Sequence, residues 1–290
     1  MSENSETGGA QSDCAQGVGC PEGRSKSAPL QLGGQNSEGR SQTTPLQLGG
    51  QPSATGTPRS TLRIGWVLGW AVPEAWFAPL ARAALPGAAH TFFPAAPDAL
   101  AALRTAGPFD WLAGYSLGAQ LLLGAEQVAR VDPNAWWGCA ATESALGSTR
   151  STIRPRVALL APMFAFPREE NTGGRMARTQ VRYLARWLRR DPAAALADFY
   201  ARAGLGVSPE QAAGLAPEIL QWGLDQLETV ALLPVLPAGW RAWCGADDPL
   251  LDAARLQELA PEIAVVPGAT HHPAALLREF SAALTAKGRE

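Results

Sequence analysis

Lysine is nearly absent from this chain of 290 residues. It occurs only at positions 26 and 287, so arginine carries almost all of the positive charge. The 24 lysine and arginine side chains are balanced by 26 aspartates and glutamates, which gives a formal net charge of −2. Nucleic-acid-binding domains usually carry a strong positive charge that attracts phosphates. The composition therefore gives no indication of a nucleic acid as a partner.

Long hydrophobic runs are also missing. The sequence has no stretch of about eighteen apolar residues, which is the length that a membrane-spanning helix requires. The first residues are polar and lack the apolar core of a secretory signal peptide. We therefore expect a cytoplasmic protein that does not associate with membranes.

Cysteine and histidine are scarce and scattered. The four cysteines, at positions 14, 20, 139 and 244, form no C-x-x-C pair and no cluster with the three histidines. Metal sites are usually recognised from such clusters, so we expect no metal. Cys244 ends an apolar segment and is expected to be a small buried hydrophobic residue. Cys14 and Cys20 lie in a polar segment and are expected to be free thiols.

Large apolar side chains are few in residues 1–59, which are rich in Ser, Gly, Gln and Pro. Such a segment cannot bury enough surface to offset the entropy lost on ordering. Residues 23–38 resemble residues 39–54, and both contain Pro-Leu-Gln-Leu-Gly-Gly-Gln. Two copies are too few for a stacked repeat array. We interpret residues 1–59 as a disordered tail, or alternatively as a linear motif for a partner, and residues 60–290 as the folded domain.

From residue 61 onward, apolar segments of strand length alternate with helical patterns. Strands are expected at 62–68, 90–93, 111–115, 157–161, 240–244 and 263–266, and helices at 73–85, 98–103, 117–131, 250–259 and 273–286. This alternation predicts an α/β fold with a mostly parallel, doubly wound sheet. Residues 163–236 show helical patterns without a convincing strand, and we interpret them as an inserted helical lid.

One short motif suggests chemistry. Residues 114–118 read G-Y-S-L-G and lie between a predicted strand and a predicted helix. This is the context of the G-x-S-x-G nucleophile elbow, in which a serine stands on a sharp strand-to-helix turn. Glycines allow the close backbone approach, and the N-terminus of the helix favours developing negative charge. The motif indicates Ser116 as a nucleophile, and the alternative is a glycine-rich turn without chemistry.

A serine nucleophile needs a base, usually a histidine, and a group that orients that base. Two loops after successive predicted strands offer candidates: Asp247, Asp248, His271 and His272. Both loops are expected at the carboxyl edge of the sheet, where Ser116 also lies. The order Ser, Asp, His along the chain is typical of α/β-hydrolases. The remaining histidine, His90, opens a strand well before the elbow.

Residues 61–290 resemble the α/β-hydrolases, and among them the pimeloyl-ACP methyl ester carboxylesterases of biotin synthesis. The sequence G-x-x-D-P at 245–249 resembles the acid loop of that family, and G-x-x-H at 268–271 resembles its histidine loop. The resemblance implies that Asp248 and His271 act, rather than Asp247 and His272.

The segment Leu68-Gly69-Trp70 stands where the family has His-Gly-Trp. The resemblance implies an oxyanion hole formed by the backbone amides of Trp70 and Leu117. Leu68 departs from the family pattern, and residues 132–154 look inserted.

The activity implied by the resemblance is ester hydrolysis through an acyl-serine, without a metal or an organic cofactor. One alternative is a general carboxylesterase or thioesterase for small free substrates. A second alternative is a binding protein that has the fold but no catalytic activity.

Residues 175–190 are predicted to form a basic helix in the lid. At about 100° per residue, its arginines fall on one side: Arg175, Arg178, Arg182, Arg186, Arg189 and Arg190. The apolar residues lie on the opposite side, which is expected to face the active site. No acidic residue of the helix relieves the repulsion between these arginines. We predict that they bind an acidic partner such as acyl carrier protein, and the alternative is an ordinary solvated face.

Overall fold

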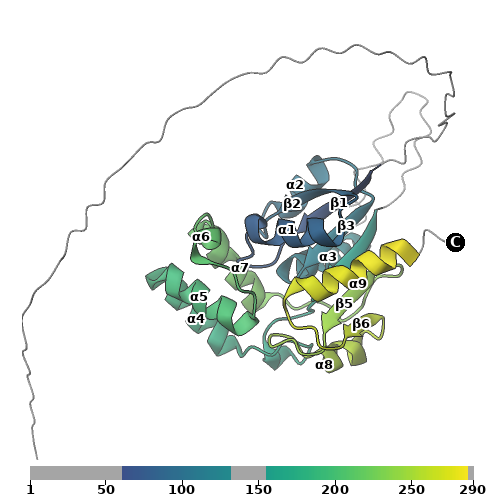
Figure 1. The fold of residues 1–290 in the computed structure, drawn as a ribbon. Coiled ribbons are helices and arrows are strands. Elements are labelled where there is room, and N and C mark those ends of the chain that lie inside the picture. Colours follow the sequence, from purple (N-terminus) through teal and green to yellow (C-terminus); the bar gives the residue numbers. More distant parts are fainter. Residues whose placement is uncertain (1–60, 132–154, 287–290) are drawn as a thin grey trace, which may run out of the picture. The chain divides into compact units, whose positions relative to one another are not determined.

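The computed structural model describes residues 61–131 and 155–286 (Figure 1). The expectations for residues 1–59 and 132–154, including their cysteines, lie outside the described residues.

The described strands form one six-stranded sheet with the order β2-β1-β3-β4-β5-β6, and every pairing in it is parallel. The strands are β1 (Leu62–Val67), β2 (Ala88–Phe93), β3 (Trp111–Tyr115), β4 (Arg156–Leu160), β5 (Arg241–Gly245) and β6 (Ile263–Val266). The central strands are apolar along most of their length because helices cover both faces of the sheet. The expected strands are confirmed to within two residues at each end.

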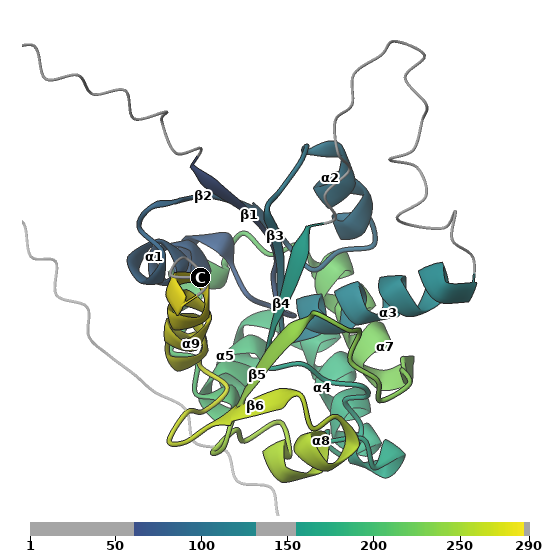
Figure 2. The ribbon, with the colours of Figure 1, turned by 90° about the vertical axis from the view of Figure 1, so that its right-hand side faces the viewer.

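Two layers of helices enclose the sheet (Figure 2). On one face, α1 (Glu74–Ala84) packs against α9 (Pro273–Ala286). On the other face lie α2 (Ala99–Thr105), α3 (Leu117–Val131) and α8 (Ala253–Leu259). The structure therefore confirms the predicted doubly wound α/β architecture.

Aromatic side chains fill the core beneath α9. The ring of Phe280 is fully buried, and its centroid lies 5.9 Å from Trp66, 5.2 Å from Trp111 and 5.8 Å from Trp243. These tryptophans stand on β1, β3 and β5, so one helical side chain packs against three strands. This contact fixes α9, and with it the loop that precedes it.

Residues 163–236, the helical insertion, separate β4 from β5. They contain α4 (Arg178–Arg190), α5 (Pro192–Ala203), α6 (Pro209–Ala212), α7 (Pro217–Thr229) and the short 3₁₀ helix η2 (Arg168–Glu170). These helices lie together beside the sheet (Figure 1). No strand occurs in this described stretch, where the extended pairing is limited to isolated bridges.

Two predicted helices begin later than expected, for one reason. The predicted helix 175–190 begins at Arg178, and the predicted helix 250–259 begins at Ala253. The residues before them pair with each other instead, through an antiparallel bridge between Gly174 and Leu251 and a hydrogen bond of 2.9 Å from Arg175 N to Leu250 O. Their backbone groups are thus satisfied outside a helix.

Candidate active site

Ser116 lies between the end of β3 and the start of α3, where the chain turns sharply. Its φ of 54° is in the left-handed region, which costs a residue with a side chain about 1–2 kcal/mol. The amide of Ser116 donates to Leu160 O over 2.9 Å, which continues the pairing with β4. The sheet therefore holds the serine in a conformation that it would not adopt alone.

The two motif glycines stand where backbone meets backbone. A Cβ atom on Gly118 would lie 2.0 Å from the carbonyl oxygen of Val67, at the end of β1. A Cβ atom on Gly114 would lie 2.6 Å from Cα of Ala119. Neither position can hold a larger residue without a shift of the backbone, so the glycines are required by the packing of α3 against the sheet.

The structure brings Ser116, Asp248 and His271 together. His271 Nε2 lies 3.2 Å from Ser116 Oγ, and His271 Nδ1 lies 2.8 Å from Asp248 Oδ2. Asp248 is fully buried, while Ser116 retains 9% of its surface. A hydrogen bond from Nδ1 to the carboxylate leaves the Nε2 lone pair directed at the serine hydroxyl.

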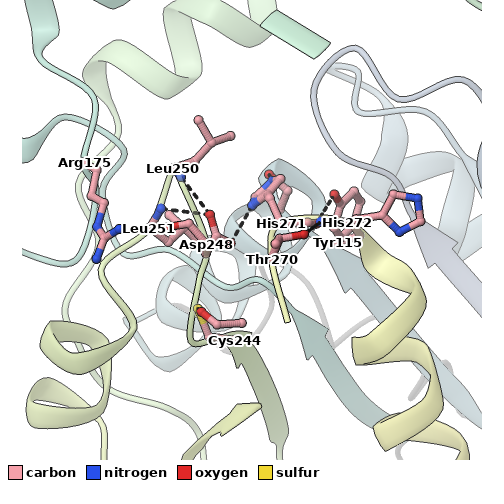
Figure 3. Close-up of polar contacts among 11 residues, drawn as sticks. Tyr115, Arg175, Cys244, Asp248, Leu250, Leu251, Thr270, His271 and His272 are labelled. Carbon is pink, nitrogen blue, oxygen red and sulfur yellow. Dashed lines mark hydrogen bonds and ion pairs between the residues drawn. The ribbon is translucent and has the colours of Figure 1, made fainter. Parts of the chain in front are cut away.

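Asp248 is oriented by the backbone of its own loop (Figure 3). Its Oδ1 accepts hydrogen bonds from the amides of Leu250 at 2.8 Å and Leu251 at 3.0 Å. The other carboxylate oxygen remains directed at His271. The acid loop thus presents one oxygen to the imidazole in a fixed direction.

The neighbouring candidates lie elsewhere. Asp247 is exposed, and its amide donates to Ala269 O. The ring of His272 packs against Trp76 with a centroid distance of 5.3 Å. His90 accepts a hydrogen bond from Trp66 Nε1 on β1. Burial lowers the pKa of both His90 and His272, which favours neutral imidazoles in structural positions.

Tyr115 supports the histidine loop, and no sequence pattern indicated this. Its hydroxyl donates to the carbonyl oxygen of His271 over 2.7 Å (Figure 3). Burial raises the pKa of Tyr115 well above its ordinary value, and the negative charge of Asp248 adds to the effect. The phenol therefore stays protonated and remains a donor. In G-x-S-x-G this residue is an unspecified x, so the motif carried no information about it.

Arg175 contacts the acid loop rather than the basic face of α4. It precedes the helix, and its Nη1 donates to the carbonyl oxygen of Asp248 over 3.0 Å. Figure 3 shows its side chain directed toward this loop. The prediction that Arg175 belongs to the arginine stripe of α4 is therefore wrong, because its backbone pairs with Leu250 and cannot join the helix.

Trp70 and Leu117 flank the serine from two sides. Leu117 is the first residue of α3, and Trp70 follows Gly69, where an added Cβ would lie 3.2 Å from Ser116 Cβ. Within the described segments, neither the Trp70 amide nor the Leu117 amide donates to a protein acceptor.

No three His, Cys, Asp or Glu side chains are grouped to hold a metal ion in residues 61–131 and 155–286. Across the same segments, no helix combines the length and apolarity needed to cross a membrane. Cys244 is buried as expected, and burial raises the pKa of its thiol.

Comparison with known proteins gives matches in structure alone. Neither a known protein family nor a curated protein matches the sequence. The esterase EaEST from Exiguobacterium antarcticum is 11% identical with a TM-score of 0.54, over 79% of this chain and 92% of that chain. The chain has the α/β-hydrolase fold.

Other solved structures align less closely. A putative lipase from Acinetobacter baumannii is 12% identical with a TM-score of 0.49, over 78% of this chain and 84% of that chain. The type II thioesterase YbtT of yersiniabactin biosynthesis is 17% identical with a TM-score of 0.49, over 81% and 94%. The fold assignment rests on the likeness to EaEST, and at 11% identity that likeness confirms the resemblance found in the sequence at the level of the fold alone.

The elbow of this α/β-hydrolase fold yields a stability test. Gly118→Ala should lower the free energy of unfolding by about 3 kcal/mol or more, because its Cβ would overlap the Val67 carbonyl. Gly124→Ala on the same helix is the control. Its Cβ would lie 3.5 Å from the flexible Leu232 side chain, and alanine favours the helix by up to about 1 kcal/mol. Urea denaturation measures both, and equal effects would contradict the proposed backbone contact.

Proposed function

We propose that the chain is a serine carboxylesterase in which Ser116 is the nucleophile, His271 the base and Asp248 the group that orients the base. The observation that carries the proposal is a continuous chain of hydrogen-bonded side chains. It runs from Ser116 Oγ through both nitrogens of His271 to a fully buried carboxylate, with 3.2 Å and 2.8 Å between the atoms. The strained backbone of Ser116 also supports it, because strain of this kind is typical of functional positions.

The reaction follows from these positions. His271 Nε2 takes the proton of Ser116 Oγ as the oxygen attacks the ester carbonyl, and then gives that proton to the departing alcohol. The amides of Trp70 and Leu117 hold the oxyanion, and each such donor is worth about 3 kcal/mol. Water, activated by the same imidazole, then releases the acid from the serine. No step requires a metal or an organic cofactor.

A cavity beside the acid loop suits an apolar acyl group. It has a volume of about 240 Å³ and lies between α4 and α5. Its walls are mostly apolar and include Met176, Leu184, Trp187, Phe199 and Leu250. Leu250 also donates its amide to Asp248, so the cavity reaches the loop that carries the acid. Asp198 and Arg202, which pair with each other, also line the cavity. We propose that its apolar wall receives the acyl chain of the substrate.

Ser116→Ala and His271→Ala should each lower kcat for a short acyl ester by about 10⁴-fold or more, because either change removes the activated nucleophile. Thermal melting should show that both variants stay folded. A fluorophosphonate probe should label the wild type at Ser116 and neither variant. An unlabelled wild type would support the alternative of a binding protein without catalysis.

Asp247, the residue before Asp248, provides a matched control for a test of the acid. Asp248→Asn should lower kcat about 10³–10⁴-fold, because the amide oxygen would stay with the amides of Leu250 and Leu251. The amide nitrogen would then face Nδ1 and donate to it, which favours the unproductive tautomer of His271. Asp247→Asn, one residue earlier and exposed, should change kcat less than about threefold. The reverse order of effects would overturn the assignment of the acid.

We further propose that the substrate is a pimeloyl-ACP methyl ester, whose acyl chain is attached to an acidic carrier protein. On α4, Val181, Ala185 and Leu188 are buried while the arginines face outward. The helix contains no acidic residue, as the sequence shows, but acidic residues of other elements pair with two of its arginines. Arg178 pairs with Glu170, and Arg182 pairs with Glu228 on α7.

Three exposed arginines of α4, Arg186, Arg189 and Arg190, form no ion pair within the described residues. Arg189 Nη1 donates to the neutral side chain of Gln221. Within the part of the chain that the structure describes, Arg186 and Arg190 contact no acidic side chain. They stand one turn apart on the outer face of α4, where unscreened positive charge attracts an acidic partner. Arg186 and Arg190 therefore support the carrier proposal better than Arg178 and Arg182, whose charges are already paired.

The double variant Arg186→Glu, Arg190→Glu should lower kcat/KM on a carrier-bound ester at least tenfold, with the loss shrinking at high salt. It should hydrolyse a small soluble ester normally. The control is Arg104→Glu, Arg278→Glu, which makes the same change of net charge at exposed positions of α2 and α9. An equal loss on both substrates, or in the control, would contradict a carrier site on α4.

A cellular test addresses the substrate itself. Expression of the chain in a biotin auxotroph that lacks its own pimeloyl-ACP methyl esterase should restore growth without biotin, and Ser116→Ala should not. Failure to restore growth by a protein that cleaves small esters would favour the general carboxylesterase or thioesterase.

A further inference from the structure

The loop that supplies the Trp70 amide is a strained turn. Residues 69–72, the oxyanion loop, are closed by a hydrogen bond of 3.3 Å from Val72 N to Gly69 O. Ala71 lies third in this turn with a φ of 57°. A left-handed residue at that place is normally a glycine, and alanine adopts the conformation only under restraint from its surroundings. The question is which groups supply the restraint.

The first restraint comes from α5 of the helical insertion. The hydroxyl of Tyr200 donates to the carbonyl oxygen of Ala71 over 2.7 Å. Tyr200 is only 4% exposed, and burial raises the pKa of its phenol, so it remains a protonated donor. The two residues are 129 positions apart in the sequence. A buried side chain of the insertion thus holds the strained residue of the loop.

The second restraint comes from α7 together with Phe199 of α5, and it fixes the side chain of Trp70. Its indole Nε1 donates to Leu220 O over 2.8 Å, and its ring meets Phe199 edge-on at 4.6 Å. Gly223 leaves room for the indole, since an added Cβ there would lie 2.3 Å from Trp70 Cδ1. Both central residues of the oxyanion loop are therefore anchored to the insertion.

We propose that Tyr200 is a positioning residue for the oxyanion hole, an inference that rests on the proposed esterase function. The Ala71 carbonyl belongs to the same peptide unit as the Val72 amide that closes the turn. Fixing this unit fixes the turn, and the turn sets the direction of the Trp70 amide beside Ser116. Without the Tyr200 hydroxyl, the carbonyl is left without its donor in a buried site, and the turn relaxes toward conformations that alanine prefers.

Tyr200→Phe isolates this effect because it removes one oxygen and keeps the ring. We expect kcat on a small ester to fall about tenfold to a hundredfold, which is less than the loss of a whole oxyanion donor. KM should change less than about twofold, because the oxyanion forms only in the transition state. Affinity for a trifluoromethyl ketone, whose adduct with serine carries the oxyanion, should fall by the same factor as kcat/KM.

Ser208→Ala is the matched control within the insertion. Ser208 caps α6, where its hydroxyl accepts a hydrogen bond from Gln211 N, and neither residue touches the oxyanion loop. The change removes one hydroxyl and its hydrogen bonding from the insertion, as Tyr200→Phe does. It should lower the melting temperature by a similar amount and leave kcat and ketone affinity unchanged.

The outcomes separate this inference from the function on which it rests. An active wild type together with an unchanged kcat in Tyr200→Phe would overturn the positioning role alone. Equal losses of kcat in Tyr200→Phe and Ser208→Ala would also overturn it, since general loosening of the insertion would then be the cause. A wild type that neither hydrolyses esters nor binds the ketone would overturn both proposals.

Discussion

The contact between α3 and the end of β1 determines the rest of the site. Gly118 lies so close to the carbonyl of Val67 that no side chain fits between them. The chain leaves Val67 directly into Leu68 and the oxyanion loop, where Gly69 lies beside Ser116. One backbone contact therefore sets Ser116, the proposed nucleophile, and residues 69–72 relative to each other. Because this contact joins backbone to backbone, it has none of the rotamer freedom that a contact between side chains would have.

The loops that carry Asp248 and His271 are also held by a close contact of backbone with backbone, at the ends of β5 and β6. An added Cβ on Gly245, at the end of β5, would lie 2.4 Å from the carbonyl oxygen of Ala269 in the histidine loop. Side chains then complete the alignment, with Tyr115 holding the carbonyl of His271 and Arg175 holding that of Asp248. The groups proposed to act stand on loops, whereas the contacts that place those loops come from strand ends and glycines.

The sequence predicted the parts of the fold that obey a local pattern. The bounds of β6 and α9 were predicted correctly, and the loops after β5 and β6 carry the acid and the histidine side by side. Tyr115, Arg175 and Tyr200 could not be assigned, because each donates to a main-chain carbonyl 156, 73 or 129 positions away. Any residue offers such a carbonyl, so these contacts leave no pattern along the chain. The same holds for the arginines of α4, whose helical face was predictable and whose acidic partners on other elements were not.

The helical insertion contributes to the proposed reaction in two physically distinct ways, and kinetics separates them. The proposed role of its outward charges at Arg186 and Arg190 is to attract a carrier, which would affect kcat/KM and depend on salt. The proposed role of its inward hydroxyl at Tyr200 is to support the transition state, which would affect kcat and not depend on salt. The two are connected, because α4 packs against both α5 and α7, the helices that hold the oxyanion loop. Charge reversal on the outer face of α4 leaves the buried face that makes these contacts unchanged. A loss of kcat in such a variant would therefore mean that the surface of the insertion communicates with the oxyanion loop through the packing of its helices.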